Sequence, residues 1–278
     1  MNARLLFILL LFTIGALWYI IGYWRRKAGE AAFAAARLTE KSEERERYCR
    51  LAVMAGHREA CRMFCLLHPE RFDGHSPHKP FKLRGIRISF YGYYYPSRYN
   101  ALLNDEQRAF CHSIYQFKQG DIHGIEFFKT CMNAKKKKKR PYHIMFMPCS
   151  NWIKYGQRFK RLDWYIGKHR QDLTSGLYDV DICDARESLH EAKGGEKRIL
   201  ERNYLITGKI KGKEIIIIDD VLTTGQSVVD YKEEIERCGG KVVAAIFYGK
   251  TLSMPSMLLV QIHVWGNHIA HIIERMTK

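Results

Sequence analysis

The second half of this sequence predicts an α/β fold, an open and mainly parallel sheet flanked by helices. Two observations carry the prediction. Residues 214–218 read EIIII, an apolar run without alternation that is typical of a parallel strand buried on both faces. From Tyr142 onward, strand-like and helical segments also alternate, as they do in βαβ units. We expect a strand at 143–148 and a helix at 152–169 before this central strand, and a further strand at 242–247 after it.

Further segments fit the same domain. Aromatic and β-branched residues at 86–95 predict a strand, and Asn104 is a candidate N-cap for a helix over 104–117. A second helical stretch is expected at 125–132. We therefore assign residues 75–278 to one α/β domain.

The region around the central strand has its own signals. A strand is expected at 178–183, and the polar, Gly-containing residues 185–203 predict a long loop or flap. A helix over 226–238 is expected to end at Gly239-Gly240, because glycine favours the conformation that follows a helix C-terminus. The central strand at 214–218, this helix and the strand at 242–247 therefore again follow the order strand, helix, strand.

The N-terminal segment is apolar enough to cross a bilayer. Leu5–Trp24 contains no charged residue, and as a helix it would be about 30 Å long, which matches the hydrocarbon core. Arg25, Arg26 and Lys27 follow at once, so the positive-inside rule predicts that the chain beyond them is cytoplasmic. We predict a transmembrane anchor at 1–27, single-pass in the inner (cytoplasmic) membrane. A cleaved signal peptide is the alternative, although the basic cluster separates the apolar run from any cleavage site.

Residues 28–74 predict a helical spacer between this anchor and the domain. The segment is rich in Ala, Glu and Arg, with apolar residues recurring three or four apart, and Gly56 is expected to separate two helices. An amphipathic spacer is the simplest interpretation of this pattern.

Composition and charge narrow the function classes. The chain has 278 residues, of which 46% are hydrophobic, so neither wholesale disorder nor a small disulfide-stapled fold is expected. Its eight cysteines form no C-x-x-C pair, which predicts reduced thiols rather than a zinc ribbon. The net charge of +17 favours a polyanionic partner. Residues 135–170 hold twelve of the cations and one acid, although their KKKKKR run is most simply a solvated loop.

Residues 215–228, IIIIDDVLTTGQSV, carry the chemistry. In open α/β sheets ligands bind at the carboxyl ends of strands, where Asp219 and Asp220 are expected. The following Thr/Gly/Ser turn places hydroxyl and backbone N–H groups at a helix N-terminus, which suits a phosphate. The two aspartates can bind hydroxyl groups or a cation, and the turn after them can bind a phosphate. Together they predict a phosphorylated ribose as the ligand. The pattern is neither a Walker loop nor the G-x-G-x-x-G dinucleotide turn.

This stretch closely resembles the phosphoribosyl pyrophosphate (PRPP) motif of type I phosphoribosyltransferases. The order of the other segments is most similar to the ComF-type branch: MFMP leads into the basic helix SNWIKYGQRFKRL, and RILERN at 198–203 precedes the motif. The resemblance covers residues 142–251. The four-cysteine zinc module usual in ComF-type proteins is missing, and the arginine-glycine-phenylalanine element is only partly present, as Gly156 and Arg158-Phe159.

The resemblance implies a role for each part of the site. Asp219 and Asp220 would be the catalytic pair that holds the ribose 2′ and 3′ hydroxyls, with Mg²⁺ bound mainly through the substrate. The 5′-phosphate would be bound by Thr223, Thr224, Gly225, Gln226 and Ser227. Pyrophosphate would be bound by Pro148, Cys149, Ser150, Asn151, Arg198 and Arg202.

Two functions follow from the sequence. The first is a membrane-anchored cytoplasmic phosphoribosyltransferase, which transfers phosphoribosyl from Mg–PRPP to a nitrogen acceptor and releases pyrophosphate. The alternative is a ComF-like, non-catalytic protein that binds PRPP or single-stranded DNA and is linked to DNA uptake. Aromatics interleaved with the basic residues would then stack on bases, or else pack in the core: Trp152, Tyr155, Phe159, Trp164 and Tyr165. Expected partners are the bilayer through residues 5–24, the ligands named above and a second copy in a homodimer.

Overall fold

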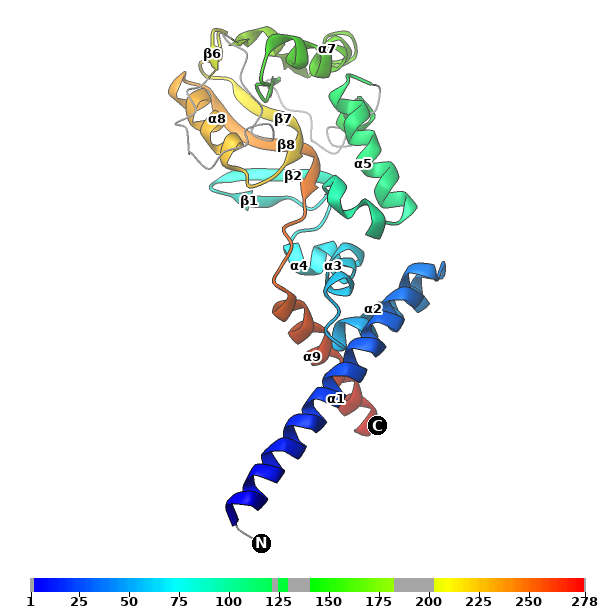
Figure 1. Cartoon of the computed structure of the whole chain (residues 1–278). Coiled ribbons are helices and arrows are strands. Elements are labelled where there is room, and N and C mark those ends of the chain that lie inside the picture. The colour runs from blue at the N-terminus through cyan, green and yellow to red at the C-terminus, as the bar shows by residue number, and fades with distance from the viewer. Residues whose placement is uncertain (1–2, 122–124, 130–140, 183–202, 278) are drawn as a thin grey trace. The chain divides into compact units, whose positions relative to one another are not determined.

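The computed structural model describes residues 3–121, 125–129, 141–182 and 203–277 (Figure 1). These residues form two compact units. The α/β unit comprises His75–Asn100 and Asn104–Leu252, and the helical unit comprises Met1–Gly74, Ala101–Leu103 and Ser253–Lys278.

The α/β unit is built on a six-stranded sheet among the described residues, in the order β1-β2-β8-β7-β3-β4. Only β1 runs antiparallel to its neighbour β2, and the other neighbouring strands are parallel. The predicted open, mainly parallel α/β sheet is therefore confirmed. The strands are β1 (Phe81–Leu83), β2 (Ile86–Tyr94), β3 (Tyr142–Phe146), β4 (Leu173–Ser175), β7 (Glu214–Leu222) and β8 (Lys241–Thr251).

The apolar strand β7 lies in the interior of the sheet, as its composition predicted. Ile215, Ile216, Ile217 and Ile218 are fully buried between β3 and β8. The strand is longer than the expected 214–218, because its pairing with β8 continues to Leu222, opposite Lys250. Asp219 and Asp220 therefore lie within the strand and not after it.

The helices of this unit cover both faces of the sheet. α5 (Asp105–Lys118) and α7 (Trp152–His169) lie on one side, and α8 (Gln226–Arg237) lies on the other (Figure 1). Asn104 caps α5, as the sequence indicated, and Gln107 completes a capping box. Residues 125–129 are also helical, within the stretch predicted at 125–132. Two short 3₁₀ helices are η1 (Ser97–Leu102) and η2 (Leu177–Asp179).

Two short strands flank the predicted flap. β5 (Val180–Ile182) pairs antiparallel with β6 (Tyr204–Ile206) in a separate two-stranded sheet. The strand expected at 178–183 is shorter than predicted, because Tyr178 belongs to η2. Residues 183–202 connect the two strands, and the predicted pyrophosphate ligands Arg198 and Arg202 lie outside the described residues, as does the 135–140 basic run.

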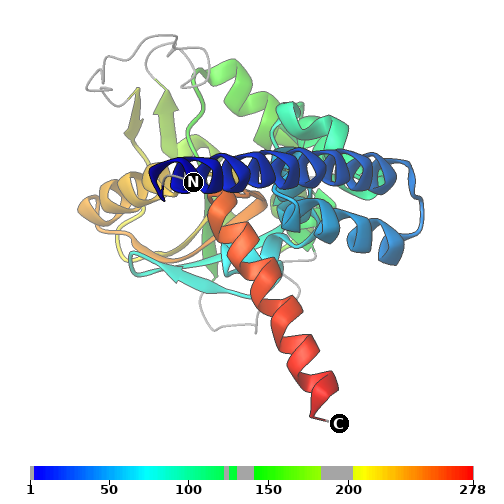
Figure 2. The same ribbon diagram turned by 60° about the horizontal axis from the view of Figure 1, so that its bottom comes forward.

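The helical unit contains α1 (Ala3–Leu38), α2 (Ser42–Met54), α3 (Arg58–Leu67), α4 (Pro69–Asp73) and α9 (Met257–Met276). Gly56 separates α2 from α3 with φ of 89°, a conformation that favours glycine, as expected. Figure 2 shows α1 as one continuous helix. It therefore runs without a break from the predicted anchor into the predicted spacer.

The predicted membrane segment is not supported as a spanning helix. Across the described part of the chain, no helix combines the length and the apolar character needed to cross a bilayer.

Candidate functional site

The acidic pair of β7 is held by two cations from neighbouring helices. Arg158 of α7 places Nη1 3.4 Å from Oδ1 of Asp219 and 3.3 Å from Oδ1 of Asp220. Lys118, at the end of α5, places Nζ 3.2 Å from Oδ2 of Asp220. The Asp219 and Asp220 side chains are only 15% and 8% exposed. Two largely buried carboxylates are tolerated here because two positive charges face them.

The two carboxyl groups differ in their pKa. Burial and the neighbouring charge of Asp220 raise the pKa of Asp219 well above its ordinary value. Burial alone would also raise the pKa of Asp220, but the charges of Arg158 and Lys118 outweigh it and lower that pKa. Asp220 is therefore the more acidic member, and Asp219 takes up a proton first as the pH falls.

The predicted phosphate loop follows directly. Thr223 and Thr224 are exposed between β7 and the N-terminus of α8, and Ser227 is exposed in the first turn of that helix. Gly225 has φ of 81°, and a Cβ added there would lie 2.2 Å from Cδ2 of Leu83. Only glycine fits this position, and it brings exposed hydroxyls and the N–H groups of α8 to one point, where an anion is favoured.

A cation missing from the predicted set lies beside this loop. Arg84 and Gly85 form the two-residue turn between β1 and β2, both with positive φ. Nη1 of Arg84 donates to Oε1 of Gln226 at 2.7 Å, and Nε2 of Gln226 donates to Asp230 at 2.6 Å. Arg84 thus brings positive charge to the phosphate loop. Its place depends on the pairing of β1 with β2, which the sequence pattern did not reveal.

The predicted pyrophosphate loop, Pro148–Asn151, follows β3 beside β7. The backbone N–H of Met147 donates to the carbonyl of Ile218 at 3.0 Å, which fixes the start of the loop at the strand that bears the acids. The side chain of Asn151 accepts from the N–H of Lys154 at 2.9 Å and so caps α7. Nδ2 of Asn203 donates to the carbonyls of Cys149 at 3.2 Å and Ser150 at 3.4 Å, so the chain after residues 183–202 is attached to this loop.

Cys149 is the one thiol of the predicted site, and it is buried. Burial raises its pKa to about 12, and the charges of Arg158 and Asp219 also act on it. The thiol is therefore protonated at neutral pH, which argues for a packing role and against a nucleophilic one.

The structure thus brings three predicted parts together at the carboxyl ends of β3 and β7: the acidic pair, the phosphate loop and the pyrophosphate loop. Lys118 and Arg158, which the set of predicted ligands did not include, complete the arrangement. Arg158 had a signal, the partial arginine-phenylalanine element. Lys118 had none, because only the fold places the end of α5 beside β7.

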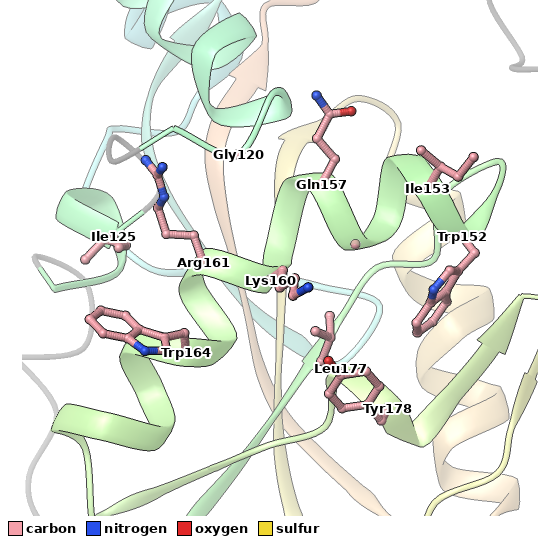
Figure 3. A pocket seen from close by; sticks show the side chains of 11 residues that line it. Gly120, Ile125, Trp152, Ile153, Gln157, Lys160, Arg161, Trp164, Leu177 and Tyr178 are labelled. Carbon is pink, nitrogen blue, oxygen red and sulfur yellow. The ribbon is translucent and has the colours of Figure 1, made fainter.

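A groove of about 850 Å³ lies on the other side of α7, where Lys160 and Arg161 are exposed (Figure 3). Trp152, Trp164 and Tyr178 line it and are 41%, 56% and 65% exposed. The remaining predicted stacking residues are not available there, because Tyr155 and Phe159 are fully buried and Tyr165 is half-buried. The structure therefore divides the interleaved aromatics into core residues and groove residues.

Comparison with known proteins points to one family. Residues 171–251 match the model of the phosphoribosyl transferase domain family. An orotate phosphoribosyltransferase of Sulfolobus acidocaldarius is 42% identical over 57 residues, which are 20% of this chain and 26% of that protein. The chain thus covers about a quarter of the length of that relative. The family match includes β7, the acidic pair and the phosphate loop, whereas β3 and the pyrophosphate loop precede it. Residues 171–251 are therefore similar in sequence to the phosphoribosyl transferase domain.

Proposed function

We propose that this protein is a phosphoribosyltransferase that binds Mg–PRPP at the carboxyl ends of β3 and β7. It would transfer phosphoribosyl to a nitrogen acceptor and release pyrophosphate. The observation that carries the proposal is the continuity of β7, the phosphate loop and α8. The strand that bears Asp219 and Asp220 leads directly into the exposed hydroxyls of Thr223 and Thr224, and Gly225 joins this loop to α8. One strand, one loop and one helix N-terminus thus offer ligands for a diol and for a phosphate.

Each part would have a distinct task. Thr223, Thr224 and Ser227 would donate to the 5′-phosphate, with the charge of Arg84 close by. The acidic pair would accept hydrogen bonds from the ribose hydroxyls and oppose the positive charge that develops at C1 as its bond to pyrophosphate breaks. The loop after β3 would bind the leaving pyrophosphate.

The donor set fits a magnesium ion that arrives with the substrate. Carboxylate oxygens are ligands that Mg²⁺ prefers, and Mg²⁺ is commonly held by one or two carboxylates together with phosphates. Arg158 and Lys118 already balance the charge of Asp219 and Asp220, which favours a shared ion over an all-protein cage. When bound with the substrate, Mg²⁺ would supply positive charge to the pyrophosphate oxygens.

The test is pyrophosphate release by the full chain with PRPP, Mg²⁺ and a panel of nitrogen acceptors. Orotate is the first acceptor to test, because the name of the similar protein from Sulfolobus acidocaldarius is orotate phosphoribosyltransferase. We expect release only when all three components are present, and its loss in Asp220→Asn. No release with any acceptor, together with no binding of PRPP, would contradict the proposal.

We also propose that the N-terminal part of α1 attaches the protein to the cytoplasmic face of the inner membrane. Large apolar side chains between Leu10 and Trp24 are exposed, among them Phe12 at 77% and Trp18 at 76%. Arg25, Arg26 and Lys27 follow them. Removal of residues 1–24 should lower the share of the protein that is found in the membrane fraction of cells. Unchanged fractionation would contradict this attachment.

The groove on α7 favours a second candidate function, the ComF-like binding of single-stranded nucleic acid. Exposed Trp152, Trp164 and Tyr178 lie beside exposed Lys160 and Arg161, a combination that suits stacked bases and a phosphate backbone (Figure 3). Affinity for a labelled oligonucleotide should fall steeply between about 50 and 200 mM salt.

Trp164→Ala should weaken that binding by about tenfold, because stacking of one base contributes ~1–3 kcal/mol. Trp265→Ala, which changes an exposed tryptophan of the helical unit, is the matched control and should bind as the wild type does. Binding that ignores salt, or equal loss in both variants, would argue against this second function.

A further inference from the structure

One side of α9 carries an exposed apolar stripe. Its large apolar residues that are 41–81% exposed are Leu258, Leu259, Ile262, Trp265, Ile269, Ile272, Ile273 and Met276. At the angular spacing of an α-helix these eight residues fall within an arc of about 140°, whereas Met257, the first residue of the helix and 37% exposed, lies outside it. His263, Asn267 and Glu274 lie outside this arc. The apolar stripe is therefore continuous along the helix, and α9 is an amphipathic helix.

The opposite side of α9 is already occupied. Val260 and Val264 are 1% and 3% exposed in the helical unit, where α9 packs against α2 and α3. Nε2 of Gln261 donates to the carbonyl of Val53 at 3.3 Å, near the C-terminal end of α2. The helix is thus docked by one side at its beginning, and the stripe is directed away from that contact.

The turn that anchors α9 also anchors α1. Nη2 of Arg25 donates to the carbonyl of Met54 at 3.1 Å, one residue from the carbonyl that Gln261 contacts. From this turn α1 continues to the N-terminus through the exposed apolar residues between Leu10 and Trp24, and α9 continues to the C-terminus. In Figures 1 and 2 the two helices run in different directions, and the N and C ends of the chain lie apart. Two exposed apolar helices therefore extend from one point of the helical unit.

We propose that the α9 stripe lies in the interface of an anionic lipid bilayer, beside the apolar part of α1. A surface helix with one apolar side and polar residues opposite is suited to the boundary between headgroups and acyl chains. Trp265 is of the residue type enriched at that depth. Arg25, Arg26 and Lys27 supply positive charge at the turn where both helices are held, which complements anionic headgroups. An apolar stripe of this extent is unusual on a soluble monomer.

The proposal is tested with the full chain bound to vesicles of phosphatidylcholine and phosphatidylglycerol that contain a photo-reactive acyl-chain lipid. After irradiation, lipid-modified peptides are located by mass spectrometry. We expect lipid adducts on stripe residues of α9, with none on His263 or Asn267. Adducts confined to α1, or spread evenly around α9, would overturn the proposal. So would cross-linking of α9 to α9 of a second copy in place of lipid.

A pair of matched variants makes the test specific. Ile269→Gln with Ile273→Gln changes the stripe, whereas His263→Gln with Asn267→Gln changes the other side of the same helix. We expect the first pair to lower the yield of α9 adducts by about tenfold and the second pair to leave it unchanged. Adducts in α1 should stay constant in both. Equal effects of the two pairs at unchanged circular dichroism would also overturn the proposal.

Discussion

Asp219 and Asp220 are adjacent in the chain, yet their ion pairs are expected to contribute different amounts to the stability of the fold. Asp220 forms ion pairs with both Arg158 and Lys118, whereas the ion pair of Asp219 within the described residues is with Arg158. Removing one partner of a buried ion pair leaves the other partner uncompensated, at a cost of about 3–5 kcal/mol. We expect Asp220→Asn to lower the melting temperature more than Asp219→Asn, measured by circular dichroism. A larger loss in Asp219→Asn would contradict the charge arrangement.

The raised pKa of Asp219 also gives a pH dependence of definite sign. In the folded protein this carboxyl binds its proton more tightly than in the unfolded chain, where its pKa is about 3.9. Its contribution to stability is therefore present below that value and is lost as the pH rises through the folded pKa. The melting temperature of the wild type, relative to Asp219→Asn, should fall across this window. A difference that does not change with pH would contradict the raised pKa.

Arg84 is the residue whose role the structure suggests most specifically. A charge-assisted hydrogen bond contributes about 1.5–3 kcal/mol, so Arg84→Gln should weaken PRPP binding by about tenfold or more. Arg87→Gln, in the next strand, is the control, because Arg87 is exposed and no contact ties it to the phosphate loop in the described residues. Calorimetric titration of both variants with PRPP measures the two affinities. Equal affinities would show that Arg84 serves only the turn.

At the scale of elements, the strand–loop–helix of β7 and α8 depends on a single backbone conformation. Gly225→Ala would place a methyl group against Leu83 at positive φ, a strain of about 1–3 kcal/mol. We expect a lower melting temperature and loss of PRPP binding. Gly156→Ala is the opposite case, since that helical position has open space and alanine favours a helix. A stable, binding-competent Gly225→Ala variant would show that the loop tolerates another conformation.

Elements with a local signal could be predicted from the sequence, and elements that form only through tertiary pairing could not. The Asn104 N-cap of α5, the apolar period of α7 and the isoleucine run of β7 are local signals. α5 and α7 form where they were expected, and β7 begins where expected but continues to Leu222. β1 and β4 span three residues each, too few to show a period, and exist through pairing with β2 and β3. The contact of Arg158 with Asp219 joins residues 61 apart, so only the folded chain shows it.

At the scale of the whole molecule, the structure divides the positive charge that α7 contributes to the basic stretch. Arg158 is turned towards the acidic pair, whereas Lys160 and Arg161 line the groove on the other side of α7. The basic helix therefore serves two surfaces, one beside the proposed pyrophosphate site and one facing solvent. The net charge favoured an anionic partner, and the fold separates the proposed PRPP site from the groove proposed for nucleic acid.

The most direct test of the central claim is the binding of PRPP to the full chain in the presence of Mg²⁺, measured by calorimetry. The matched variant is Thr224→Glu, which adds a negative charge at an exposed loop position without changing the core. The account predicts that the wild type binds PRPP and that Thr224→Glu, folded to the same extent, does not. A wild type that fails to bind PRPP, or a Thr224→Glu variant that binds it equally well, would contradict a phosphate site at the N-terminus of α8.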